Sequence, residues 1–86
     1  PGIEDEVVEL VESNILTEKM GEIIKNSLSE REYEIIKLRY GLFGNKPLTQ
    51  REVASRLGIS RSYISRLETK AMETIKEEIT KRNLLV

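Results

Sequence analysis

The chain has 86 residues, of which 38% are hydrophobic and 34% charged, and its formal net charge is −1. This length allows one small domain, and the composition is too apolar for a disordered chain. No apolar run approaches the roughly 20 residues that would cross a bilayer, and no signal-peptide pattern opens the sequence. The chain contains no Cys and no His, which removes thiolate and imidazole chemistry. We therefore expect no enzyme, no cofactor, no metal and no membrane contact.

Charge is distributed unevenly along the sequence. Residues 1–30 contain eight acidic and two basic residues, a net charge of −6, whereas residues 31–86 contain twelve basic and seven acidic residues, a net charge of +5. Between Lys37 and Lys70 the net charge is +6, from eight basic and two acidic residues. A basic segment of this kind fits contact with phosphate groups; the alternative is a solvated charged face.

Helix-forming residues dominate throughout and the alternation typical of strands is missing, so we expect an all-α domain of four to five helices. Residues 3–13 predict a first helix, and residues 1–16 as a whole are interpreted as an acidic linker or a loosely packed N-terminal helix. Residues 17–86 form the domain proper. Thr17 can cap a second helix, whose apolar stripe comprises Met20, Ile23, Ile24 and Leu28. Because the sequence begins with Pro1 rather than Met, we expect a piece of a larger protein.

Two capping boxes mark the next helices. Ser29 with Glu32 predicts the start of a third helix, and Thr49 with Glu52 predicts a short helix that ends at about residue 56. Residues 41–47 between them contain two Gly and one Pro and predict a loop. Its two apolar side chains, Leu42 and Phe43, are expected to fold back onto the core.

Residues 49–69 fit a helix-turn-helix. Ala54 is small where two helices must cross closely, and Gly58 stands in a tight turn where a positive φ is expected. Ser60 then caps a last helix over about residues 61–80. The apolar residues expected to pack in this motif and along the last helix are Val53, Leu57, Ile59, Ile64, Leu67, Ala71, Ile75 and Ile79. The alternative is an ordinary helical hairpin with a glycine turn.

The last helix carries polar residues opposite its apolar stripe. In a helix-turn-helix the second helix enters the major groove of DNA, where Arg can bind guanine, Ser can bind several bases and a Tyr ring can pack on a thymine methyl group or a sugar. The candidate base contacts are Arg61, Ser62, Tyr63, Ser65 and Arg66. The candidate contacts to the DNA backbone are Arg31, Arg39, Thr49, Arg51 and Lys70. The alternative for each arginine is a solvent-exposed residue that pairs with a neighbouring Glu.

Four segments resemble region 4 of bacterial sigma factors of the sigma-70 family. They are residues 28–32 (LSERE), 35–42 (IIKLRYGL), 48–54 (LTQREVA) and 57–68 (LGISRSYISRLE). The resemblance covers roughly residues 18–80, and the last segment is most similar to the sporulation-type sigma factors. It implies the C-terminal sigma domain that recognises the −35 promoter element, in a bacterial, cytoplasmic and nucleoid-associated protein. Ser62, Tyr63 and Ser65 replace longer charged residues of the primary factors, so the −35 preference should differ.

The family resemblance also implies protein partners. The domain is expected to dock on the flap of the RNA polymerase β subunit through an apolar surface, for which the candidates are Leu42, Phe43, Met72 and Ile75; a purely core role for all four is the alternative. An anti-sigma factor is a further possible partner, and a monomer is expected. Two other functions stay open: the DNA-binding output domain of another helix-turn-helix regulator, and a domain that mainly binds proteins.

Overall fold

The computed structural model describes residues 8–9 and 18–82, and every regular element within these ranges is a helix. The helices are α2 (Glu18–Ser27), α3 (Glu30–Tyr40), a short 3-10 helix η1 (Leu42–Gly44), α4 (Gln50–Leu57) and α5 (Arg61–Lys81). The all-α prediction is therefore confirmed. Residues 8 and 9 are helical, while the remainder of residues 1–16 and the Thr17 cap lie outside the described residues.

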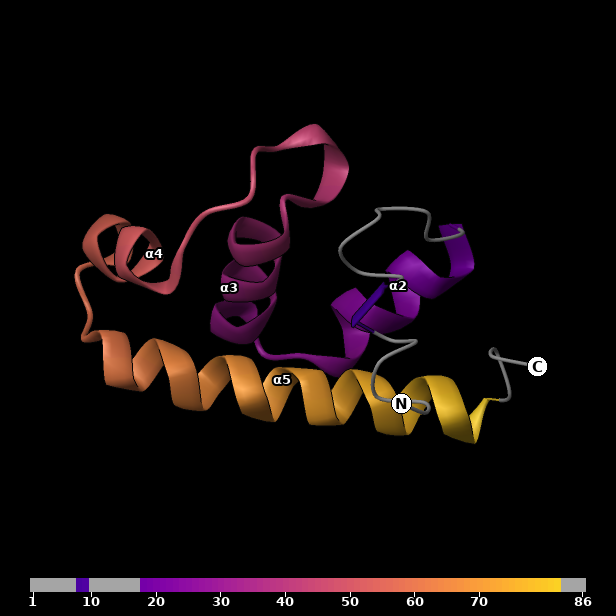
Figure 1. Cartoon of the computed structure of the whole chain (residues 1–86). Helices are drawn as coiled ribbons and strands as arrows, with labels where there is room; N and C mark the ends of the chain where they lie inside the picture. Colours follow the sequence, from indigo (N-terminus) through magenta and orange to yellow (C-terminus); the bar gives the residue numbers. More distant parts are fainter. Residues whose placement is uncertain (1–7, 10–17, 83–86) are drawn as a thin grey trace.

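Helix α5 is the longest element and the one against which the others pack. It has 21 residues, which corresponds to a length of about 30 Å. Figure 1 shows α4, α3 and α2 arranged in that order along α5, from its N-terminal end to its C-terminal end, and each of the three contacts α5. One continuous helix thus carries both the second half of the helix-turn-helix and one wall of the remaining core.

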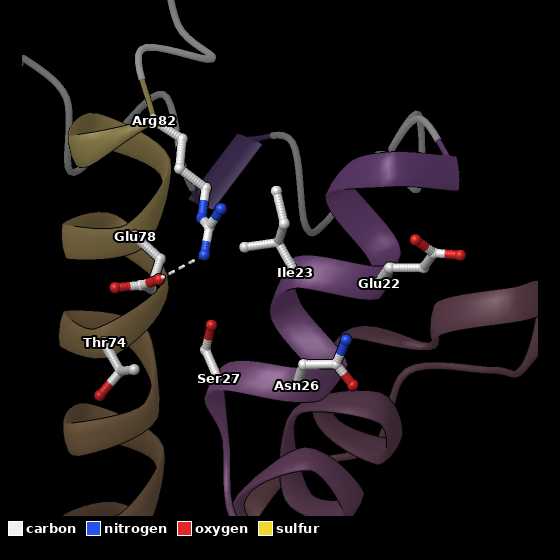
Figure 2. A pocket seen from close by; sticks show the side chains of 7 residues that line it. All are labelled: Glu22, Ile23, Asn26, Ser27, Thr74, Glu78 and Arg82. Atoms are coloured by element: carbon white, nitrogen blue, oxygen red, sulfur yellow. Dashed lines mark hydrogen bonds and ion pairs between the residues drawn. The ribbon is translucent and has the colours of Figure 1, made fainter.

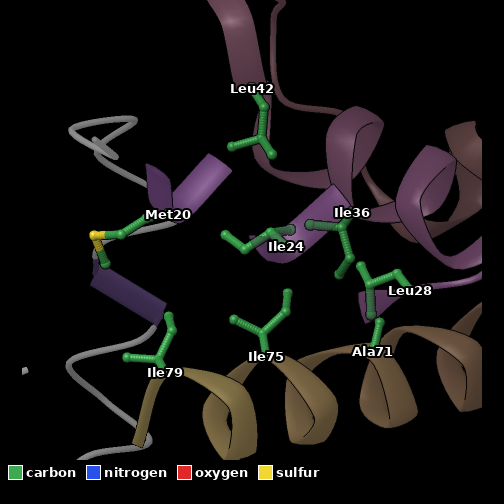
Figure 3. Packing of buried hydrophobic residues seen from close by; sticks show 8 residues of the cluster. All are labelled: Met20, Ile24, Leu28, Ile36, Leu42, Ala71, Ile75 and Ile79. Carbon is green, nitrogen blue, oxygen red and sulfur yellow. The ribbon is translucent and has the colours of Figure 1, made fainter. Parts of the chain in front are cut away.

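The core consists of two clusters of buried side chains. One lies between α2, α3 and the C-terminal half of α5, and Figure 3 shows Ile24, Ile36 and Ile75 meeting near its centre. The other lies between α3, α4 and the N-terminal half of α5 and is built on Ile35, Val53, Ala54 and Ile64. Ile35 and Ile36 are adjacent in sequence but belong to different clusters, so α3 lies between the two clusters and contributes to both.

The apolar residues predicted for the helix-turn-helix behave as expected. Val53 and Ile64 are fully buried, and three partly buried residues of the motif pack against the same cluster, namely Leu57, Ile59 and Leu67. Along α5 the buried stripe continues through Ala71, Ile75 and Ile79. This arrangement agrees with the predicted helix-turn-helix.

Both capping boxes are present. The Ser29 hydroxyl accepts a hydrogen bond from the Glu32 backbone N–H at 3.1 Å, and the Glu32 carboxylate accepts one from the Ser29 N–H at 2.9 Å. Thr49 and Glu52 make the same reciprocal pair at 3.1 and 2.8 Å. These bonds satisfy N–H groups that a helix start would otherwise leave without a partner.

Left-handed residues form the ends of α3 and α4. Gly41 has φ 63° and Gly58 has φ 70°, and each donates its backbone N–H to a carbonyl of the preceding helix. Phe43 is also left-handed, with φ 60°, and its side chain is 60% exposed. The expectation that Phe43 folds back onto the core was therefore wrong. Only Leu42 folds back onto the core (Figure 3), whereas Phe43, the next residue in this tight turn, projects outward.

The two helix-ending glycines differ in the space around them. A Cβ at Gly41 would collide with the Asn45 carbonyl oxygen and approach the Pro47 nitrogen to 2.8 Å, whereas a Cβ at Gly58 meets nothing within 4 Å. We expect Gly58→Ala to lower the free energy of unfolding by about 1–2 kcal/mol, which is the cost of a left-handed alanine. Gly41→Ala should cost roughly 3 kcal/mol or more because steric overlap is added. Urea unfolding of both variants measures the difference; equal losses would contradict the close contact at Gly41.

Candidate nucleic-acid interface

The first two turns of α5 present the predicted base contacts to solvent. Arg61, Ser62, Tyr63 and Arg66 are exposed and Ser65 is half-buried. At 100° per residue, one side of the helix collects the set that we call the α5 polar face: Arg61, Ser62, Ser65, Arg66 and Thr69. Tyr63 lies at the edge of this face. The structure therefore places four of the five candidates on one face of one helix, with Tyr63 beside that face.

The start of α5 is capped and free of acids. The Ser60 hydroxyl accepts a hydrogen bond from the Tyr63 N–H at 3.2 Å and lies 3.3 Å from the Ser62 hydroxyl. The first turn contains no acidic residue. The positive end of the helix dipole and the charge of Arg61 therefore act together at this end, which favours an anionic partner.

A basic hollow adjoins this end of α5. It has a volume of about 500 Å³ and is lined by Arg39, Thr49, Gln50, Arg51 and Arg61. It thus joins the start of α4 to the start of α5, the two helix N-termini of the motif. Arg51 and Arg61 are exposed, and their guanidinium groups make no ion pair with any other described residue. The two exposed guanidinium groups and the two helix N-termini therefore favour an anion at this hollow.

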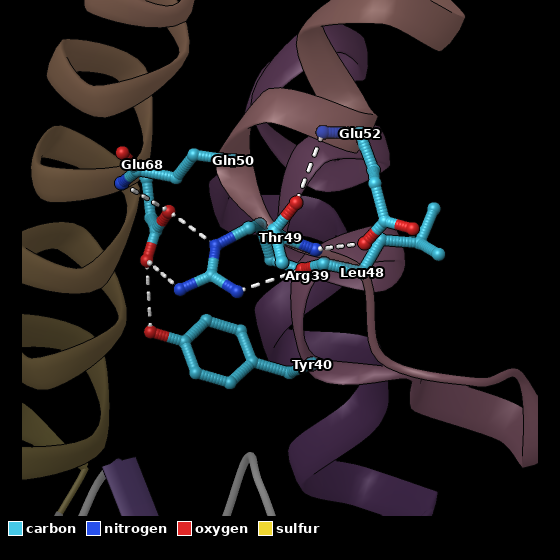
Figure 4. Close-up of polar contacts among 7 residues, drawn as sticks. All are labelled: Arg39, Tyr40, Leu48, Thr49, Gln50, Glu52 and Glu68. Atoms are coloured by element: carbon cyan, nitrogen blue, oxygen red, sulfur yellow. Dashed lines mark hydrogen bonds and ion pairs between the residues drawn. The ribbon is translucent and has the colours of Figure 1, made fainter.

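A buried carboxylate, Glu68, holds α3, α4 and α5 in their relative orientation (Figure 4). Glu68 is 8% exposed. It accepts hydrogen bonds from Arg39 Nε at 2.8 Å, from Gln50 Nε2 at 3.0 Å and from the Tyr40 hydroxyl at 3.0 Å. Arg39 Nη2 also reaches its second oxygen at 3.4 Å. Three helices are therefore joined at one side chain.

This network assigns Arg39 a structural role. Its Nη1 donates to the Leu48 carbonyl at 2.8 Å, in addition to the two bonds to Glu68. These bonds use three of the five N–H donors of the guanidinium and pair its charge with Glu68, so they favour the alternative of an arginine that pairs with a glutamate over a contact to the DNA backbone. Glu68 itself was missed from sequence, although an acid four residues after Ile64 and three before Ala71 lies on the apolar stripe of α5.

Burial alone would raise the pKa of Glu68, but the hydrogen bonds from Arg39 and Gln50, together with the Arg39 charge and the Tyr40 hydroxyl, outweigh it and hold this pKa below its usual value. Glu68 is therefore charged in the folded protein at neutral pH. The pKa of the capping Glu52 is also lowered, chiefly by the backbone and side-chain hydrogen bonds of Thr49. Thr49 thereby has its hydroxyl engaged within its own helix cap.

The remaining candidate backbone contacts are exposed cations. Arg31 lies 3.7 Å from Glu34 in the next turn of α3, and both side chains are 46% exposed. Lys70 is 73% exposed, and its Nζ lies 3.9 Å from Glu32 Oε2. That carboxylate oxygen is buried and accepts no hydrogen bond from the described residues. Lys70 is thus placed next to a buried charge, but its exposure leaves it able to reach a phosphate.

The four candidate docking residues separate into two groups. Leu42 and Ile75 are each 1% exposed and belong to the core between α2, α3 and α5, so they offer no side-chain area to a partner. Their burial favours the alternative, a purely core role, for these two residues. Met72 is partly buried against the same cluster, and Phe43 is the most exposed large apolar side chain of the described residues. The docking prediction therefore narrows to Phe43 and Met72.

A second hollow lies between α2 and α5 (Figure 2). It has a volume of about 470 Å³ and is lined by Glu22, Ile23, Asn26, Ser27, Thr74, Glu78 and Arg82. Arg82 Nη2 lies 3.4 Å from Glu78 Oε1 within it. None of the predicted site residues lines this hollow.

In the part of the chain that the structure describes, no group of three or more acidic residues is arranged to hold a metal ion. None of the helices within these ranges is both long enough and apolar enough to cross a membrane.

Comparison with known proteins places the chain in a family. The family model for Sigma-70, region 4 matches residues 26–77, a range that contains α3, α4 and most of α5. The chain belongs to the sigma-70 region 4 family. The resemblance noted from the four sequence segments is thus confirmed, including its sporulation-type character.

Curated relatives give the same assignment. The chain is 57% identical over 54 residues to the RNA polymerase sigma-E factor of Clostridium acetobutylicum, covering 63% of this chain and 23% of that protein. It is 46% identical over 68 residues to the RNA polymerase sigma-28 factor of Bacillus thuringiensis subsp. kurstaki (79% and 28%) and 44% identical over 68 residues to the RNA polymerase sigma-K factor of Bacillus subtilis (79% and 23%). The chain spans about a quarter of the length of these relatives. No solved structure matches it significantly.

The Glu68 network predicts a specific pH dependence of stability. Since the folded pKa of Glu68 is lowered, its contribution is fully present above the unfolded pKa of about 4.3 and is lost as pH falls through the folded pKa. We expect Glu68→Gln to lower the free energy of unfolding at neutral pH by about 2–3 kcal/mol. The difference in the free energy of unfolding between the wild type and this variant should become smaller below about pH 4. Urea unfolding across this pH range measures it.

Glu34→Gln is the matched control, because it makes the same substitution in an exposed ion pair on α3. It should change the free energy of unfolding by less than about 0.5 kcal/mol at any pH. If the Glu68→Gln curve ran parallel to the wild-type curve from neutral to acidic pH, Glu68 would not be the titrating group.

Proposed function

We propose that this domain binds promoter DNA at the −35 element and thereby directs RNA polymerase to the start of transcription. The observation that carries the proposal is the α5 polar face: an acid-free, hydrogen-bonding surface at the start of a helix that α4 and Glu68 hold in place. Membership of the sigma-70 region 4 family supports the same function. It also argues against the output domain of another type of helix-turn-helix regulator. The domain's part is binding, and the catalysis belongs to the polymerase.

The contacts divide into those that read bases and those that position the protein. With the first two turns of α5 in the major groove, Arg61 and Arg66 reach guanine edges while Ser62 and Ser65 bond to neighbouring bases. The hollow between the starts of α4 and α5 then faces the DNA backbone, with Arg51 and the N–H groups of α4 toward a phosphate. The short serine side chains require the helix to approach the bases closely.

A protein contact with RNA polymerase is the second part of the proposal. The side chain of Phe43 is 60% exposed on a left-handed backbone position, and such a conformation costs about 1–2 kcal/mol for a residue other than glycine. An exposed aromatic ring held at that cost favours a docking role. We propose Phe43 and the half-buried Met72 as contacts for the flap of the β subunit. An anti-sigma factor that competes for the domain would use the same surface.

The test is selection of DNA by the domain itself. The 86-residue chain is incubated with duplexes that carry a randomised segment of about 12 base pairs, slightly more than one helical turn. Bound duplexes are separated and sequenced at two salt concentrations, and affinity is followed by fluorescence anisotropy. We expect one short motif to be enriched at both concentrations. Binding that depends on salt but enriches no motif would contradict base readout by α5.

Arg61 and Arg51 are expected to respond differently to substitution. Arg61→Ala should weaken binding to the selected motif by about 1–3 kcal/mol and relax the preference at one base pair. Arg51→Ala should weaken binding to all sequences alike and lower the slope of log affinity against log salt by about 1. Anisotropy titrations with selected and scrambled duplexes separate the two effects.

Lys70→Ala should weaken binding to all sequences alike, as Arg51→Ala does. Because Lys70 lies beside the buried Glu32 carboxylate, thermal unfolding of this variant is measured as well, to separate lost binding from lost stability. Lys81→Ala is the control for lost charge alone, since Lys81 is 75% exposed at the far end of α5. It should leave the base preference unchanged. If Arg61, Arg51 and Lys70 all behaved alike, the division into reading and positioning residues would be wrong.

A further inference from the structure

Tyr63 and Arg66 form a contact on the surface of α5. They stand three residues apart, and the guanidinium carbon of Arg66 lies 5.4 Å from the centroid of the Tyr63 ring. Tyr63 is 40% exposed and Arg66 is exposed. A cation held over an aromatic face at this distance is attracted by the electron density of the ring. The contact therefore restricts the Arg66 side chain in the free protein.

The way in which an arginine is held decides what it can still bind. A guanidinium group carries its N–H donors in its plane, so a partner over its face leaves these donors available. Arg39 differs in its hydrogen bonds: its guanidinium carbon also lies 5.4 Å from a ring centroid, that of Tyr40, but three of its N–H groups donate to Glu68 and to the Leu48 carbonyl. Arg66 makes no ion pair with another described residue. It also donates no hydrogen bond to another described residue, so its N–H donors are available to a partner.

We propose that Tyr63 is a positioning residue for Arg66, and that the two side chains read one base pair as a unit. The ring holds the guanidinium so that its edge faces the major groove, where it bonds O6 and N7 of a guanine. This inference rests on the proposed function of the α5 polar face. It replaces the expectation that Tyr63 itself packs on a thymine methyl group or a sugar.

The position of Tyr63 supports this division of roles. Thr69 lies near the middle of the α5 polar face, and at 100° per residue Tyr63 points about 120° away from it, with Arg66 about 60° away on the same side. The ring is therefore closer to the edge of the groove than the guanidinium is. From there it can cover one face of Arg66 and exclude water from it, while the bases lie in front of Arg66.

The contact itself is tested without DNA. In the free 86-residue chain, the ring current of Tyr63 should move the NMR signals of the Arg66 Hδ protons upfield. Tyr63→Leu should remove this shift, because it deletes the ring and keeps an apolar side chain that favours the helix. Tyr63→Phe should keep the shift, because the ring face remains. If the Arg66 signals were the same in the wild type and in Tyr63→Leu, the stacked arrangement would be refuted.

The positioning role is tested by a double-mutant cycle on DNA. Duplexes that carry the selected motif and its single-base variants are titrated with the wild type, Tyr63→Leu, Arg66→Ala and the double variant. Tyr63→Leu should weaken binding about 3-fold and relax the preference at the same base pair as Arg66→Ala. In the Arg66→Ala background it should have no further effect. Tyr63→Phe should bind as the wild type does.

Arg56→Gln is the control for charge, since Arg56 is an exposed cation in the last turn of α4. It should leave the preference at every base pair unchanged. A loss of preference at a different base pair in Tyr63→Leu, or none, would overturn the positioning role while the proposed function stands. A wild-type chain that selects no motif would overturn the proposed function and, with it, base reading by Arg66.

Discussion

Glu68 lies on the buried side of α5 and accepts hydrogen bonds from Arg39, Tyr40 and Gln50, which belong to α3 and α4. A carboxylate removed from water is costly unless it is paired and its oxygens are satisfied. Both oxygens are satisfied here only when the three helices take their observed positions. Pairing the charge of Glu68 therefore requires one arrangement of the three helices, and this arrangement sets the angle between α4 and α5.

The packing of α3 extends this constraint to the whole domain. Ile35 belongs to the cluster shared with α4, while Ile36 belongs to the cluster shared with α2. Rotation of α3 would expose one of the two, at about 1.5–3 kcal/mol for a side chain of this size. Arg39, one turn further along α3, is thereby aimed at Glu68. The hydrophobic clusters and the ionic network thus favour the same orientation of α3, and each disfavours orientations that the other alone would allow.

Much of this arrangement was predictable because it rests on local rules. The Ser29 and Thr49 caps, the Gly58 turn and the buried stripe of α5 follow from spacing along a single helix. The role of Arg39 and the exposure of Phe43 did not follow in this way. A long arginine side chain can turn toward solvent or toward another helix, and the choice depends on a carboxylate 29 residues away. The direction of Phe43 depends on its own left-handed backbone, two residues after the left-handed Gly41, and an apolar pattern does not record such a conformation.

The same network also shapes the charge of the surface proposed to meet DNA. The overall net charge of −1 gives no indication of a surface that attracts phosphate. Residues 61–67 contain no acid, and the first acid of α5 is Glu68, which is buried and paired with Arg39. The first carboxylate along α5 is thus turned away from the α5 polar face and paired with a cation. The next acid along α5 is Glu73, more than a full helical turn further on. The ion pair that sets the angle of the helix therefore also keeps negative charge out of the region where α5 would approach the bases.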